Sequence, residues 1–495
     1  GLKATPLDIV DNPKNVKILE LDAAQLPRTL DEVEAAVINT NYALAADLNP
    51  RVDALVLEDG ASLWANLLVT RADNRDDPRL AALKAFRTRL DAIPEAGLSD
   101  KEALNRGYLA WELGSRIGQI EHDTARMPIS SDGGFEDTLN YVAATTPMRS
   151  EADAEAWLAR LEALPGYYRD NIENARRGAR TGFTQPRPTV ALILARAKAA
   201  AGAPIEGDPL LRPFRSLPDA IPAERQAAIR ARAEAILREK VRPVQREFAG
   251  FLERDYLPAA RRTLGIRGAP GGEAYYRFAV RDFTTTGLTP EEVFALGDAE
   301  VARIRAEMET VKRAAGFDGE LSAFIAMLRK DSRFHAASRE DLLEKASEIA
   351  KRIDDQLPGW FGTLPRLTYG VRPVPPEIEA AYTTGRYFQG SPEQGVAGGY
   401  MVNTYALDQR PLYELPALTA HEAVPGHHLQ IALAQELKDL PMFRREGGVT
   451  AFVEGWGLYS EKVAGEMGVT PTAGVRVKLA EGLAWQDLAS LSAAE

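Results

Sequence analysis

Residues 421–428 have the sequence HEAVPGHH, and this octet holds three of the five histidines of the chain. In the common HExxH arrangement, two histidines one helical turn apart bring both imidazoles to one zinc ion. Here Pro425 occupies the position four residues after His421, and the next histidines are His427 and His428. On an unbroken helix, a residue seven positions later lies about 10.5 Å along the axis, which is too far to share one ion.

The Pro425-Gly426 pair predicts a distorted helix that absorbs the extra residues, because proline cannot donate a backbone hydrogen bond and glycine accepts unusual dihedral angles. If two residues are absorbed, His427 takes the place of the second histidine ligand, whereas His428 would need three. We therefore expect His421 and His427 to be metal ligands. His428 is expected beside the site as a catalytic neighbour, where it can donate a hydrogen bond to substrate or orient a carboxylate.

A catalytic zinc needs a third protein ligand and an open fourth position for water. The segment TAFVEGWGLYSEKVAGEMG (residues 450–468) has a helical pattern and places Glu454 in an apolar stretch, where an unpaired carboxylate would be costly. Glu454 is therefore the predicted third ligand. Glu422, next to His421, is the predicted general base, which takes a proton from water as the water attacks a carbonyl and passes it to the leaving amine.

Residues 398–408, GGYMVNTYALD, lie just upstream of the octet and offer candidates for substrate binding. Tyr400, Asn403 and Tyr405 can bind a peptide along a strand edge or be ordinary strand residues, and the sequence leaves both interpretations open. Tyr459 is a further candidate for contact with substrate, although its position also suits helix packing. A packing or surface role is expected for Glu461, and no role is assigned to His122 or His335.

The composition of the whole chain excludes several classes of protein. The 495 residues favour two or more folding units, and 45% apolar with 26% charged residues is typical of a water-soluble protein without a transmembrane segment. The net charge of −11 makes nucleic acid an unexpected partner. The absence of cysteine excludes disulfides and thiolate metal sites and leaves the compartment open. The chain begins at Gly1 without a leader, so any export signal is expected outside it.

The chain changes character near residue 80. Up to that point, short apolar runs such as VKILEL (16–21) alternate with turns, which predicts a small α/β segment over residues 1–83. Long amphipathic helices follow, so residues 84–495 are predicted to be mainly α. Two helix starts carry capping boxes, Ser99–Glu102 and Thr289–Glu292.

The front segment resembles the C-terminal part of the methionine-binding lipoproteins of ABC importers, the NlpA-like family. The resemblance runs through AAVINTNYALAADLNP (35–50) and continues to about residue 83. It implies a fragment of a periplasmic binding protein fold and a contact between Asn39 and a bound amino acid. Because half of a two-lobed cleft cannot bury a ligand, a turn or strand-end role is preferred for Asn39.

Residues 84–495 resemble a bacterial family known as domain of unknown function 885, chiefly through RPLYELPALTAHEAVPGHHLQ (410–430) and FVEGWGLYSEKVAGEMG (452–468). Members are similar in fold to zinc carboxypeptidases of the Taq type, which are helical zincin-like metallopeptidases with a long channel. The resemblance implies Zn²⁺ held by His421, His427 and Glu454, with Glu422 as base.

Two departures from the family qualify this expectation. The front of the family is replaced by the lipoprotein-like piece, and the resemblance is expected to end after about Gly468. We therefore expect a zinc-dependent peptidase of oligopeptides, truncated at both ends. The alternatives are a metal-binding but inactive homologue and a residual methionine-binding module. The source families imply a periplasmic or extracellular location, with or without a lipid anchor, and the oligomeric state is not predicted.

Overall fold

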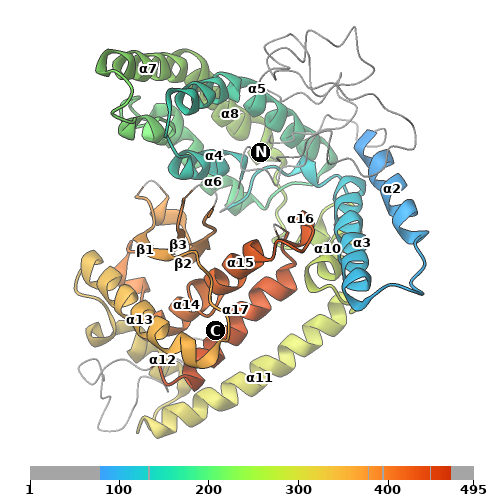
Figure 1. Cartoon of the computed structure of the whole chain (residues 1–495), viewed down its shortest axis with the longest axis vertical. Coiled ribbons are helices and arrows are strands. Elements are labelled where there is room, and N and C mark those ends of the chain that lie inside the picture. The colour runs from blue at the N-terminus through green and yellow to red at the C-terminus, as the bar shows by residue number, and fades with distance from the viewer. Residues whose placement is uncertain (1–77, 132–133, 377, 393–394, 446, 470–495) are drawn as a thin grey trace. The chain divides into compact units, whose positions relative to one another are not determined.

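The computed structural model describes residues 78–131, 134–376, 378–392, 395–445 and 447–469, and this part of the chain is mainly helical, as predicted (Figure 1). The chain divides into two compact units, Gly1–Leu68 and Val69–Glu495. The first unit and Asn39 lie outside the described residues. Within the second unit, helix α2 (Pro78–Asp91) runs across positions 83 and 84, where the sequence analysis places its boundary.

A first group of helices surrounds one hydrophobic core, which contains Trp157, Phe214 and Phe248. The indole of Trp157 donates a hydrogen bond to the carbonyl of Leu210 at 3.0 Å, so the ring is buried without an unsatisfied donor. After α2 and α3 (Asp100–Glu121), which contribute no residue to this core, its helices are α4 (Phe135–Thr145), α5 (Glu151–Thr181), α6 (Arg187–Gly202), α7 (Ala223–Ile236), α8 (Arg242–Phe251) and α9 (Leu257–Ala259).

Most of the remaining helices and one small sheet form a second core, in which Phe324, Phe334 and Tyr400 are fully buried. Figure 1 shows α17 running alongside the short helices α14 and α15. The helices are α10 (Gly272–Thr284), α11 (Pro290–Ala314), α12 (Leu321–Lys330), α13 (Arg339–Trp360), α14 (Leu415–Glu422), α15 (His427–Glu436), α16 (Met442–Arg445) and α17 (Thr450–Glu466).

The sheet has the strand order β1-β3-β2, with β1 (Tyr369–Pro373), β2 (Gly385–Phe388) and β3 (Gly398–Val402). Strand β3 pairs in parallel with β1 and antiparallel with β2, so that β2 lies at one edge. The edge of a sheet leaves backbone N–H groups available for other partners. On β2, the backbone N–H of Tyr387 donates to the carboxylate of Glu422, the predicted general base.

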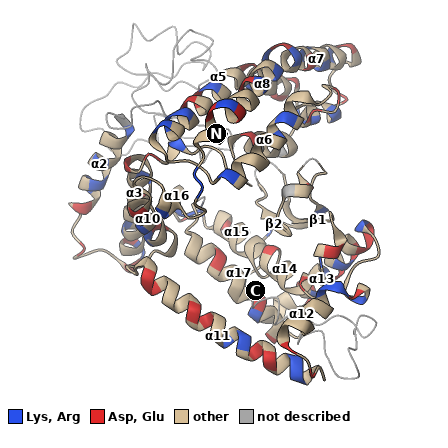
Figure 2. Cartoon of the chain, turned by 180° about the vertical axis from the view of Figure 1, so that it is seen from behind, with Lys and Arg blue, Asp and Glu red and all other residues tan. Residues whose placement is uncertain are grey.

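Both predicted capping boxes are confirmed. The side chain of Ser99 accepts from the backbone N–H of Glu102, and the Glu102 carboxylate accepts from Ser99; Thr289 and Glu292 form the same pair at the start of α11. Figure 2 shows acidic and basic side chains mixed along α11, where Arg303 forms ion pairs with Glu300 and Glu307. Among the described residues, no helix combines the length and apolarity needed to cross a membrane.

Candidate metal centre

The octet folds as two short helices separated by an irregular turn. Helix α14 ends at Glu422, and α15 begins at His427. In the turn, the N–H of Gly426 donates to the carbonyl of Ala420 at 2.9 Å, and the peptide bond before Pro425 is cis. The distortion predicted from Pro425 and Gly426 is therefore present, but the helix stops and restarts instead of bulging as one continuous helix.

Gly426 is required at this turn because the backbone of α14 leaves no room for a side chain. A Cβ atom at Gly426 would lie 1.9 Å from the carbonyl oxygen of His421 and 2.4 Å from that of Ala420. The turn is also tied to α17, since the indole of Trp456 donates to the carbonyl of Pro425 at 2.8 Å. Both contacts lie at the point where α15 restarts, directly before His427.

Three predicted ligands come together around the turn. One carboxylate oxygen of Glu454 lies 3.3 Å from Nε2 of His421 and 3.7 Å from Nε2 of His427, and the three donor atoms lie within 4.8 Å of one another. Donors bound tetrahedrally to one zinc at about 2.0–2.2 Å are separated by roughly 3.3–3.6 Å. The two separations from Glu454 are therefore close to those of zinc ligands, and the donor set fits a zinc ion once its most distant atoms move closer together.

The imidazole of His421 rests directly on the backbone of α17. A Cβ atom at Gly457 would lie 2.5 Å from Cε1 of the His421 ring, so glycine permits this close approach. On the far side of the ring, Nδ1 of His421 lies 2.8 Å from a carboxylate oxygen of Glu461, which is mostly buried. A carboxylate on Nδ1 fixes the tautomer and directs Nε2 toward the metal position.

A packing or surface role was expected for Glu461, and its mostly buried side chain excludes the surface role, while its contact with His421 goes beyond simple packing. Glu461 lies on α17 seven residues after Glu454, which is about two helical turns and therefore the same face. That spacing was the available signal, because a carboxylate on the ligand-bearing face can reach a ligand of the opposite helix. The partner of Glu461 could not be identified without the position of α14.

The pKa values of the two histidines of the cluster are shifted in opposite directions. Burial, followed by the charge of neighbouring His421, lowers the pKa of His427 to about 4, so His427 is neutral near pH 7. A neutral imidazole can bind a cation without first losing a proton. Burial also acts to lower the pKa of His421, but the hydrogen bond to Glu461 and the surrounding carboxylates outweigh it and raise the pKa overall.

Glu422 lies beside the cluster and is held by the edge of the sheet. One of its carboxylate oxygens accepts a hydrogen bond from the backbone N–H of Tyr387 in β2 at 2.6 Å. Burial raises the pKa of Glu422, while the charge of His421 and the hydrogen bond from Tyr387 oppose that effect. A carboxyl group with a raised pKa accepts and releases protons closer to neutral pH, which suits a general base.

His428 faces away from the three donor atoms. Its ring is 2% exposed, with Nδ1 3.0 Å from the hydroxyl of Tyr387 and Nε2 3.0 Å from the carbonyl oxygen of Leu367. Both ring nitrogens are therefore used inside the protein. In this arrangement the second histidine near Glu454 is His427, and the hydrogen bond from His428 to substrate that sequence analysis expected has no nitrogen left to make it.

Tyr400 and Asn403, two candidates for substrate binding, are fully buried. The hydroxyl of Tyr400 lies 3.2 Å from that of Thr419. The amide of Asn403 donates to three backbone carbonyls and accepts from the N–H of Tyr405, so it organises the loop after β3. Both side chains therefore hold the sheet against its neighbours and offer no atom that a substrate can reach in this arrangement.

Several side chains of α17 near the cluster are exposed. The side chain of Glu454 is 56% exposed, and Tyr459 on the same helix is 55% exposed. Phe452 and Leu458 are also exposed there. Tyr459 therefore remains accessible to a substrate, in contrast to Tyr400 and Asn403.

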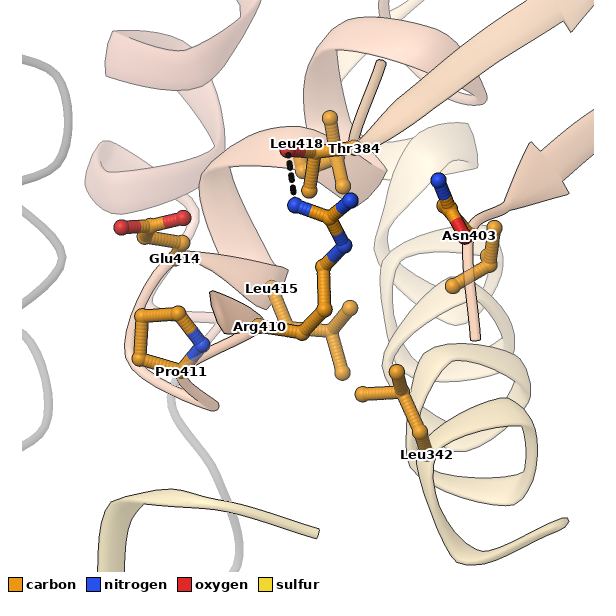
Figure 3. Close-up of a pocket in the computed structure, with 9 residues that line it drawn as sticks. Leu342, Thr384, Asn403, Arg410, Pro411, Glu414, Leu415 and Leu418 are labelled. Atoms are coloured by element: carbon orange, nitrogen blue, oxygen red, sulfur yellow. Dashed lines mark hydrogen bonds between the residues drawn. The ribbon is translucent and has the colours of Figure 1, made fainter. Parts of the chain in front are cut away.

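A small pocket elsewhere in the second core does not belong to the cluster (Figure 3). The side chain of Arg410 extends into it, with a terminal nitrogen 3.3 Å from the hydroxyl of Thr384. The lining residues are Leu342, Thr384, Val402, Asn403, Arg410, Pro411, Glu414, Leu415 and Leu418, and none of the predicted ligands is among them. Because the pocket is small and none of the predicted ligands or the predicted base lines it, we do not assign it to substrate.

Residues 1–91 match the family described as NlpA lipoprotein. The chain is 55% identical over 78 residues to the D-methionine-binding lipoprotein MetQ of Salmonella typhimurium, covering 15% of this chain and 29% of that protein. It is 50% identical over 86 residues to outer membrane lipoprotein 2 of Mannheimia haemolytica, covering 17% and 31%. The chain thus spans less than a third of the length of these curated relatives.

The fold of the larger part is shared with a solved structure. The putative lipoprotein from Colwellia psychrerythraea superposes with a TM-score of 0.75 at 24% sequence identity, over 84% of this chain and 72% of that one. A second family profile, described as bacterial protein of unknown function, matches residues 59–486. The match continues past Gly468, so the expectation that the resemblance ends there was wrong. Because it covers well over half of the 495 residues, the chain belongs to this family, DUF885.

Proposed function

We propose that this chain is a zinc-dependent peptidase that hydrolyses peptide bonds in oligopeptides. The observation that carries the proposal is the convergence of His421, His427 and Glu454, whose donor atoms lie within 4.8 Å of one another, with Glu422 adjacent in sequence to the first ligand. Two imidazoles and one carboxylate with an open fourth position are typical of catalytic zinc. The zincin-like architecture and its channel, implied by resemblance, belong to the same proposal.

Bound zinc supplies Lewis acidity, which polarises a peptide carbonyl and makes water acidic near neutral pH. Glu422 takes the proton of the attacking water and passes it to the leaving amine. The backbone N–H of Tyr387 holds one oxygen of Glu422, so the other oxygen is left to receive the proton. Glu461 keeps the ring of His421 oriented through Nδ1.

Metal content measured by elemental analysis tests the first half of this proposal. The parent chain is expected to carry one zinc, and His421→Ala is expected to carry almost none. Equal zinc in the two proteins would end the proposal. The exposed Glu466 on the same helix α17 supplies a control, since Glu466→Ala should leave the zinc content unchanged.

Glu422→Gln tests the second half. Removing a general base commonly lowers turnover by about 10²–10⁴-fold, while the ligands remain in place. We expect the variant to keep its zinc and to lose turnover of a peptide library to this degree. Unchanged turnover would remove Glu422 from its role. A parent that binds zinc yet leaves the library intact, with and without chelator, would favour the metal-binding but inactive alternative.

The 55% identity of the front segment to a D-methionine-binding lipoprotein supports a second candidate function, residual methionine binding. Calorimetry with methionine tests it, and heat of binding that disappears in Asn39→Ala would support it. The relatives named as lipoproteins also support a lipid-anchored location outside the cytoplasm. Cell fractionation of the full-length gene product tests that location, because a soluble cytoplasmic product would contradict it.

A further inference from the structure

Tyr387 contacts two residues of the octet, Glu422 and His428. Its backbone N–H donates to the Glu422 carboxylate at 2.6 Å, and its hydroxyl lies 3.0 Å from Nδ1 of His428. We infer that His428 is a positioning residue, which fixes Tyr387 and thereby orients the carboxylate of Glu422 toward the metal cluster. The inference rests on the proposed function, because it assigns His428 a role in the action of the base.

The hydrogen bonds of His428 define its tautomer. Nε2 lies 3.0 Å from the carbonyl oxygen of Leu367, which can only accept, so Nε2 carries the hydrogen. In the neutral ring Nδ1 then accepts, and the hydroxyl of Tyr387 donates to it. The ring therefore ties β2 to the segment that enters β1.

The surrounding residues make room for this pair and hold it in place. A Cβ atom at Gly398 in β3 would lie 2.6 Å from the Tyr387 hydroxyl and 2.8 Å from Nδ1 of His428. The ring of Tyr369 lies 4.7 Å from the His428 ring, and its own hydroxyl is bonded to Asp354 at 2.9 Å. Each ring is thus held on more than one side, and a small shift of His428 is transmitted to Tyr387.

The consequence for Glu422 follows from the position of β2. Because β2 lies at an edge of the sheet, Tyr387 has backbone support from β3 on one side and offers its N–H to Glu422 on the other. If the Tyr387 side chain were released, β2 and the carboxylate could move together. A misplacement of a reacting group by about 1 Å can lower the rate by about 10²-fold.

Two substitutions at position 428 separate positioning from a general packing role. The amide of His428→Asn reaches the place of Nδ1 and can still accept from Tyr387, whereas that of His428→Gln reaches the place of Nε2 and can bond only Leu367. We expect His428→Gln to lower kcat by about 10- to 100-fold with unchanged KM and zinc content. His428→Asn should retain most of the activity, and Tyr387→Phe should behave like the Gln variant.

Hydrogen exchange at the Tyr387 amide, measured on the metal-free protein, provides a readout that does not depend on turnover. We expect faster exchange in His428→Gln and Tyr387→Phe than in the parent or His428→Asn. The control His122→Gln should show no change, because the ring of His122 packs against Phe278 instead. Equal exchange in all variants, or equal losses of kcat in the Asn and Gln variants, would overturn the inference. A parent without peptidase activity would refute the proposed function while the exchange result still decides the positioning role.

Discussion

Prolines interrupt the helical hydrogen-bond pattern in two regions of the molecule, and the helix continues through the proline in only one of them. In the first core, π-helical turns at Leu237–Val241 and Leu252–Tyr256 precede Pro243 and Pro258, and the backbone stays right-handed helical throughout. In the octet, the helix stops before Pro425. The wider π turns accommodate a proline, which has no N–H to donate, within one continuous helix. In the octet one helix ends and a new helix begins.

The two kinds of interruption place different side chains: the π turns place core residues, and the break in the octet places a predicted metal ligand. The residues of the π turns that face inward, such as Leu237 and Tyr256, are completely buried, so these turns serve packing. The interruption in the octet is followed by Gly426, whose lack of a side chain lets the chain pass against the last carbonyls of α14. This close passage brings His427 back toward His421 although six positions separate them. In the first core a proline without a neighbouring glycine is accommodated within a helix. In the octet, proline followed by glycine changes the direction of the chain.

The largest expected effect tests whether the break delivers His427 and not His428 to the metal. His427→Ala should reduce bound zinc to below about a tenth of the parent value, since it removes one of three protein ligands. His428→Asn should keep its zinc. Elemental analysis of both proteins, after dialysis against the same buffer, measures the difference. If the His428 variant lost its zinc and the His427 variant kept it, the metal ligand would be His428 and not His427.

Glu461→Ala tests the support that α17 gives to α14. Loss of the carboxylate on Nδ1 of His421 should weaken zinc binding by about 10- to 100-fold, the usual effect of removing a group that orients a ligand. Competition with a chromogenic chelator measures the affinity. The control is Glu466→Ala, an exposed position on the same helix, which should leave the affinity as it is. Equal affinities for all three proteins would leave Glu461 as the packing residue that the sequence suggested.

Gly426→Ala tests the turn itself. A Cβ atom 1.9 Å from the His421 carbonyl forces the backbone to move, so we expect a loss of about 3 kcal/mol or more in the free energy of unfolding. Gly297→Ala in α11 is the matched control, because nothing lies within 4 Å of the added atom, and it should gain about 0.5–1 kcal/mol from helix propensity. Urea unfolding of both variants gives the values, and a neutral Gly426 variant would mean that the turn can relax.

Local sequence signals predicted the helical class, both capping boxes and the distortion at Pro425-Gly426, since each depends on residues close together in the chain. Glu454 stood out because a carboxylate buried in an apolar run would need a partner, but its side chain is 56% exposed, so that reason was wrong although Glu454 does lie in the cluster. The sequence could not show which side of the octet faces β2, and this side decides the surroundings of His428. The role of Glu461 and the burial of Tyr400 likewise depend on contacts between segments far apart in the chain, which no local pattern contains.

The smallest effect is expected from Trp456→Phe, which removes only the hydrogen bond from the indole to the carbonyl of Pro425. Loss of one such bond should cost about 0.5–1.5 kcal/mol of unfolding free energy. Trp360→Phe, at an exposed position at the end of α13, is the control and should be close to neutral. If the bond also clamps the turn, zinc affinity should fall in the Trp456 variant and not in the control. A stability loss without any change in affinity would show that Gly426 and the backbone of α14 define the turn without help from α17.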